Sequence, residues 1–173
     1  MRVLHPCGVG THIEVNINER LMEEGLSYRE RAIAARREFA AHSTTIGISE
    51  EFIDRLVETF YGRIRADAVL GPIFEKAIRD RWSTHLAKMK EFWSSIAFVN
   101  GRYSGKPMQA HAKLLPELQP SHFGIWLRLF RETVEASAPT PEAAAFFISR
   151  SERIAESLQL GLFYRPDQAA PKC

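Results

Sequence analysis

The most regular hydrophobic pattern in the chain lies between residues 49 and 66. Its apolar positions recur every three or four residues: Phe52, Ile53, Leu56, Val57, Phe60, Tyr61 and Ile64. This spacing places them on one wide face of an α-helix that packs against a core. Ser49 is suited to cap the helix, and Glu50 and Glu51 follow in the first turn, where the helix dipole favours negative charge. We therefore predict a long core helix that buries the ring of Tyr61, whose hydroxyl needs a polar partner.

Apolar spacing and capping residues predict the other elements in the same way. We expect helices over Tyr28–His42, from about Asp80 to Phe98, from a Ser121 cap to about Ala136, and from the Thr140–Pro141 start to about Phe163, with a short turn or helix after Leu70. Residues 44–48 are expected to form a linker. No alternating strand pattern and no repeat is visible, so the predicted fold class is all-α.

Two histidines stand out because their helices point them inward. Trp82, His85, Leu86, Met89, Trp93 and Ile96 share one helical face, which turns His85 toward the interior and leaves Lys88 on the margin. His111 lies one turn into a short helix that Pro107 can open and that Pro116 and Pro120 close. A helix this short is not stable alone, so something must hold it in place. Taken alone, each histidine reads more simply as a core, capping or surface residue.

Composition narrows the class of protein further. The chain has 173 residues, 45% hydrophobic and 25% charged, with a net charge of +2, which fits one soluble domain and gives no sign of nucleic-acid binding. Cys7 and Cys173 lie near opposite ends, so no disulfide framework follows, and no Cys-x-x-Cys-His motif for covalent haem attachment is present. No apolar run approaches the ~18 residues of a membrane span. We expect a cytoplasmic protein without membrane partners.

Several segments together resemble the group III truncated haemoglobins. They are Phe60-Tyr61-x-x-Ile64-Arg65, Leu70-Gly71-Pro72-Ile73-Phe74, Trp82-x-x-His85-x-x-Lys88-Met89-x-x-Phe92-Trp93, Tyr103-x-Gly105-x-Pro107-x-x-x-His111 and His122-Phe123-x-x-Trp126-Leu127-x-Leu129-Phe130. The resemblance runs from Ile48 to about Phe163 and implies a two-over-two globin-like helical sandwich around haem b. We accordingly expect an irregular segment 1–27, an extra N-terminal helix and linker 28–47, a truncated globin domain 48–164 and a disordered tail 165–173.

The resemblance also implies roles for individual residues. His111 would be the proximal iron ligand, Tyr61 and Trp126 the distal hydrogen-bonding pair, and His85 the distal histidine. Phe60 would join the distal side that binds the ligand, and the cofactor site would further include Phe74, Met89, Trp93, Tyr103 and Met108. Lys88 is the first candidate partner for a haem propionate, with Arg102 and Lys106 from the following loop, because such long side chains can reach the edge of a pocket.

The predicted function is reversible binding of O2, NO, CO or a similar small ligand, with slow O2 release because two donors stabilise a ligand that carries negative charge. The alternative is a redox enzyme on the same haem, either for nitric oxide detoxification or with peroxidase-like activity, served by an unidentified reductase. A third possibility is a haem-free interaction module that docks through residues 28–42. The expected state is a monomer or weak dimer.

Overall fold

The computed structural model describes residues 27–164, and the structure of these residues is all-helical. The helices are α2 (Tyr28–Thr45), α3 (Glu50–Ala66), α4 (Leu70–Ile78), α5 (Trp82–Phe98), α6 (Pro107–Ala112), α7 (Pro120–Ser137) and α8 (Pro141–Phe163). The predicted all-α class is confirmed. The predictions of an irregular N-terminal segment and a disordered tail fall, apart from Ser27, outside the described residues.

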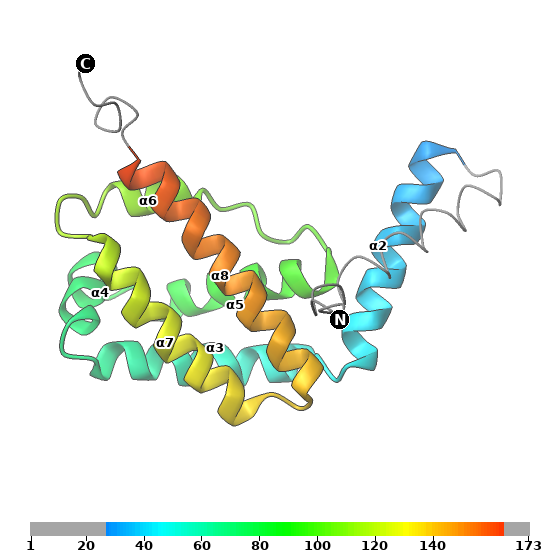
Figure 1. Cartoon of the computed structure of the whole chain (residues 1–173), viewed down its shortest axis with the longest axis horizontal. Helices are drawn as coiled ribbons and strands as arrows, with labels where there is room; N and C mark the ends of the chain where they lie inside the picture. The colour runs from blue at the N-terminus through cyan, green and yellow to red at the C-terminus, as the bar shows by residue number, and fades with distance from the viewer. Residues whose placement is uncertain (1–26, 165–173) are drawn as a thin grey trace, which may run out of the picture.

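Two pairs of helices make up the body of the molecule. α3 packs against α5 and α7 against α8, and α3 also packs against α7, which joins the two pairs. Figure 1 shows α3 and α5 running beneath and behind α7 and α8, while α2 projects away from this body. The arrangement agrees with the predicted two-over-two sandwich. Within the described part of the chain, no helix is long and apolar enough to cross a membrane.

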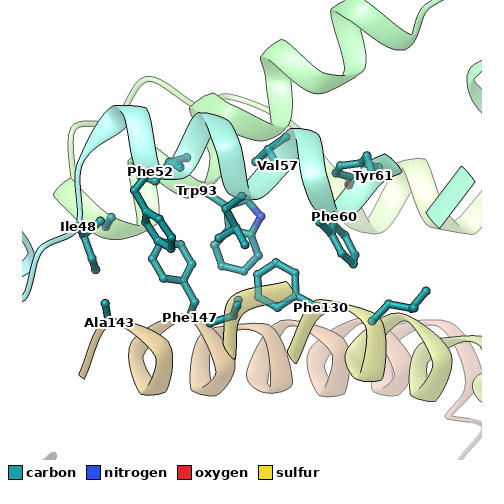
Figure 2. Packing of buried hydrophobic residues seen from close by; sticks show 14 of the residues in the cluster. Ile48, Phe52, Val57, Phe60, Tyr61, Trp93, Phe130, Ala143 and Phe147 are labelled. Carbon is teal, nitrogen blue, oxygen red and sulfur yellow. The ribbon is translucent and has the colours of Figure 1, made fainter. Parts of the chain in front are cut away.

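The core between the pairs is mainly aromatic. Figure 2 shows Phe52 and Phe60 of α3 directed toward Phe130 of α7 and Phe147 of α8, with Trp93 of α5 between them. The Trp93 and Phe130 rings stack with centroids 4.8 Å apart, and the Phe52 and Phe147 rings meet edge to face at 5.5 Å. Each such side chain contributes about 1.5–3 kcal/mol on burial. This rigid core fixes the positions of the helices around the site.

Local signals explain most helix ends, and tertiary contacts explain the exceptions. Ser49 and Thr140 cap α3 and α8 as predicted. The predicted linker is wrong at its start, because α2 continues to Thr45 and the buried Ser43 hydroxyl donates to the carbonyl of Ala97 at 2.6 Å. The predicted Ser121 cap is also wrong: α7 begins at Pro120, so Ser121 lies inside the helix.

The junction between α3 and α4 depends on a close backbone approach at Gly71. The amides of Val69 and Leu70 donate to the carboxylate of Asp67, at 2.9 and 2.8 Å, and turn the chain into α4. A Cβ atom at Gly71 would lie 2.7 Å from the carbonyl oxygen of Arg65, which is closer than real Cβ contacts allow. Only glycine lets the two helices approach this closely.

Replacing Gly71 by Ala should therefore lower the free energy of unfolding by about 1–3 kcal/mol, because backbone must move to admit the methyl group. Gly62 is a matched control, since it is also helical but has open space around its Cβ position. Gly62→Ala should raise the same free energy by about 0.5–1 kcal/mol. Urea unfolding followed by circular dichroism measures both. A Gly71→Ala protein as stable as Gly62→Ala would contradict the close-approach account.

Candidate functional site

One large cavity lies beside the aromatic core and collects most of the residues that the sequence singled out. Its volume is about 430 Å³, within the range of ~300–1,000 Å³ typical of cofactor pockets. Ten of the predicted site residues line it: Tyr61, Phe74, His85, Lys88, Met89, Trp93, Tyr103, Lys106, His111 and Trp126. Phe60, Arg102 and Met108 are not part of its wall. Residues from α3, α4, α5, α6, α7 and α8 and from the loop before α6 therefore meet at one site.

His111 enters the cavity from α6 with its ring already oriented. Its Nδ1 atom lies 2.8 Å from the carbonyl oxygen of Pro107, one turn earlier in the helix. A carbonyl can only accept, so this contact places the ring proton on Nδ1. The Nε2 atom is then left with a free lone pair, which is the form of imidazole that ligates a metal ion.

α6 has only six residues and is held by packing on α8. The Met108 side chain lies over Gly161, where an added Cβ would come within 2.3 Å of its terminal methyl carbon. Met108 and Leu114 pack with Leu118, Phe123 and the α8 residues of a second apolar cluster. Met108, which was predicted to contact a cofactor, instead packs the α6 helix that carries His111 onto α8.

Tyr61 brings a buried hydroxyl-bearing side chain to the cavity wall. Its side chain is 5% exposed, and burial raises the pKa of its hydroxyl, so the group stays protonated and can donate a hydrogen bond. Phe60 lies behind it, with ring centroids 5.1 Å from Tyr61 and 5.3 Å from Trp126. Trp126 in turn stacks on Phe130 at 5.3 Å. Phe60 thus supports both predicted distal donors without reaching the cavity itself.

His85 lines the same cavity. Its Nε2 atom is buried and has no hydrogen-bond partner among residues 27–164. Burial, with smaller contributions from His111 and Lys88, lowers the pKa of His85 to about 4. The ring is therefore neutral at pH 7. A buried polar atom without a protein partner costs free energy, which makes it uncommon in a folded protein.

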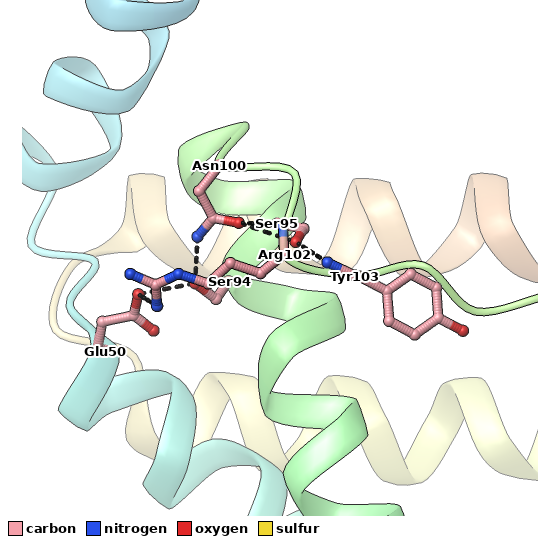
Figure 3. A network of polar contacts seen from close by, with 6 residues as sticks. All are labelled: Glu50, Ser94, Ser95, Asn100, Arg102 and Tyr103. Atoms are coloured by element: carbon pink, nitrogen blue, oxygen red, sulfur yellow. Dashed lines mark hydrogen bonds and ion pairs between the residues drawn. The ribbon is translucent and has the colours of Figure 1, made fainter.

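The three cationic side chains that the sequence singled out divide into two groups. Lys88 and Lys106 are exposed and line the cavity. Arg102 instead donates to the carboxylate of Glu50 at 3.1 Å, which also accepts from the hydroxyl of Ser94. Figure 3 shows these groups in a network that continues through Asn100 and Ser95 to the backbone of Tyr103. The network anchors the loop that leads to α6.

Part of the cavity wall carried no functional signal in the sequence. Phe123 of α7 and Ile154 and Leu158 of α8 are apolar residues of helices, a pattern that indicates only packing in the core. They line the cavity together with Ala155 and His122. Spacing alone cannot distinguish an apolar residue that faces another side chain from one that faces a cofactor.

Comparison with known proteins places the chain in a family. No protein-family model matches it. A group 3 truncated haemoglobin of Campylobacter jejuni is 35% identical over 119 residues, which are 67% of this chain and 92% of that protein. The crystal structure of the group III truncated haemoglobin from Campylobacter jejuni matches with a TM-score of 0.63 at 35% identity, and the match covers 67% of this chain and 92% of that one. The chain belongs to the group III truncated haemoglobins.

Membership of a haemoglobin family implies haem as the cofactor, and the cavity fits it in three respects. Its apolar wall can pack against a flat macrocycle, and the Nε2 lone pair of His111 can bind the iron. The exposed Lys88 and Lys106 can pair with the two propionate carboxylates of haem. No group of three or more His, Cys, Asp or Glu side chains able to hold a metal ion is present among the described residues. A single histidine ligand is sufficient for haem, because the macrocycle supplies four further nitrogens.

The low pKa of His85 predicts a pH effect on stability in protein prepared without haem. The pKa is about 4 in the folded state and about 6.5 in the unfolded chain, so the unfolded state binds more protons between these values. The free energy of unfolding should fall as the pH drops through this window, by on the order of 1–3 kcal/mol from this residue. His85→Leu should remove that part of the loss. Urea unfolding at pH 7, 5.5 and 4 measures it, and parallel curves for the two proteins would contradict the assignment.

Proposed function

We propose that this chain is a haem b protein that reversibly binds O2 and other diatomic ligands and releases O2 slowly. The observation that supports it most directly is the presence, in one cavity, of His111 with a free Nε2 lone pair and of the buried Tyr61 hydroxyl. Bound haem supplies an iron coordination position for a diatomic ligand. The side chains around that position decide how long the ligand stays.

Tyr61 and Trp126 are the proposed donors to the ligand. The raised pKa of Tyr61 keeps its hydroxyl protonated, and the indole nitrogen of Trp126 can only donate. A ligand that gains negative charge on binding, as O2 does, accepts hydrogen bonds of about 1.5–3 kcal/mol from such groups. CO gains much less charge and benefits less. The dry, aromatic surroundings strengthen each bond relative to water.

Lys88 and Lys106 are the proposed partners of the haem propionates. Both line the cavity and are exposed, so each ion pair would contribute only ~0–1 kcal/mol. Arg102 is the weaker candidate, because its guanidinium group already pairs with Glu50. The propionates therefore orient the cofactor, while His111 and the apolar wall supply most of its affinity.

The second candidate function is a redox reaction on the same haem, such as nitric oxide detoxification or a peroxidase-like reaction. The neutral His85 ring in the cavity wall favours it, because an imidazole can hold a proton beside a reacting ligand. Sustained turnover with an added reductase would support this candidate. Ligand binding without turnover would support the first.

Replacing His111 by Gly tests the proposed ligand. The variant should lose the visible spectrum of five-coordinate ferrous haem, and added imidazole should restore it by entering the space that the side chain leaves. His122→Gln is a useful comparison, since His122 also lines the cavity but its Nδ1 accepts from the amide of Gln119 at 3.2 Å. An unchanged spectrum in His111→Gly would assign the iron to another residue.

Replacing Tyr61 by Phe tests the donor role. The ring and its packing remain, and only the hydroxyl is lost, so O2 dissociation should accelerate about tenfold or more. CO dissociation should change much less, which makes the O2-to-CO ratio the diagnostic quantity. Stopped-flow displacement of each ligand gives both rates. If Tyr61→Phe released O2 at the original rate while His85→Leu released it faster, His85 would be the principal donor.

A further inference from the structure

A cluster of three side chains ties α3, α4 and α5 together behind the cavity. The carboxylate of Glu75 accepts one hydrogen bond from Arg65 Nε at 2.9 Å and another from the indole nitrogen of Trp82 at 3.0 Å. The Arg65 guanidinium carbon also lies 4.6 Å from the centre of the Trp82 ring. Each of the three side chains therefore contacts the other two.

The Trp82 ring is the part of this cluster that reaches the distal residues. It is not among the described residues that line the cavity, but it contacts two that do. Its ring meets Tyr61 edge to face at 6.3 Å between centroids and His85 at 6.1 Å. The Tyr61 and His85 rings are themselves 4.9 Å apart. A shift of the indole would remove a contact that both rings share and would let them move.

We propose that Glu75 is a positioning residue for the distal side of the cavity, and that it acts by holding the Trp82 indole against Tyr61 and His85. The Arg65–Glu75 pair is about half exposed on both sides, so its ionic attraction alone is weak. The indole hydrogen bond to a charged carboxylate is stronger and directional. Hydrogen bonds from Trp82 and Arg65 lower the pKa of Glu75, which keeps the carboxylate ionised at neutral pH.

The functional consequence rests on the proposed role of Tyr61 as a donor. A hydrogen bond to a bound ligand depends on where the hydroxyl is held, and a loosened ring donates less well. Loss of the Trp82 contact should therefore accelerate O2 release and leave CO release nearly unchanged. The contact of the Trp82 indole with Tyr61 and His85, however, can be tested in protein without haem.

Three variants distinguish the positioning role of Glu75 from a general effect on stability. Glu75→Leu removes both hydrogen bonds, whereas Glu75→Gln keeps a carbonyl oxygen that can accept from Trp82. Glu117→Gln is the matched control, because it breaks a second exposed ion pair of α4, which joins Lys76 to Glu117. Among the described residues, no hydrogen bond, ion pair or ring contact joins that pair to Tyr61, Trp82 or His85.

The first readout is nuclear magnetic resonance of protein prepared without haem. Glu75→Leu should shift the Tyr61 ring resonances and speed hydrogen exchange at the Trp82 indole, while Glu75→Gln and Glu117→Gln should leave both close to the original protein. Unchanged Tyr61 resonances in Glu75→Leu would overturn the proposal. Equal shifts in Glu117→Gln would overturn it as well, since they would show a general effect of loosening α4.

The second readout is ligand release in the haem-loaded variants. The rate of O2 dissociation should rise about three- to tenfold in Glu75→Leu and by no more than about twofold in Glu75→Gln. The rate of CO dissociation should stay the same in both variants. If Tyr61→Phe accelerates O2 release and Glu75→Leu does not, the positioning role fails and the proposed function stands. If Tyr61→Phe has no effect, the donor role fails, and the ring resonances alone decide the role of Glu75.

Discussion

The hydrogen bond from the His111 ring to the carbonyl oxygen of Pro107 is the interaction on which the candidate site depends. It spans one turn of a six-residue helix and fixes both the rotation of the ring and the nitrogen that carries the proton. Without it, either nitrogen could face the cavity with or without a proton. A helix this short has little stability of its own, so packing of Met108 and Leu114 on the second apolar cluster must hold it. The orientation of one ring thus depends on contacts with α8.

The same packing leaves a cavity that a cofactor would fill. A cavity of about 430 Å³ beside an aromatic core forfeits dispersion contacts, and the buried Nε2 of His85 has no partner in the described part of the chain. Both features reduce the stability of the chain by itself. A group that fills the space and binds only the folded state returns that free energy by mass action. The site is therefore costly in isolation and stabilised by the haem that the family implies.

The sequence predicted those parts of the structure in which local and tertiary preferences agree. Ser49 caps a helix whose apolar stripe faces the core, and the structure has both features. The resemblance predicted which residues gather around the cavity, and ten of thirteen line it. The remaining residues depend on distant partners. Arg102 pairs with Glu50, which lies 52 positions away, and the spacing of apolar residues does not predict such a pair. Met108 lies in a helix too short to show a face, so only its packing over Gly161 reveals its direction.

The most direct test of this account is the tautomer of His111 in protein prepared without haem. Nitrogen-15 resonance of labelled histidine distinguishes a protonated ring nitrogen from one with a free lone pair, and His111→Gly identifies the signal. We expect a proton on Nδ1 and a free lone pair on Nε2 at pH 8, because the Pro107 carbonyl can only accept. A ring with the proton on Nε2 would contradict it, since the nitrogen that faces the cavity could not then bind iron without rearrangement.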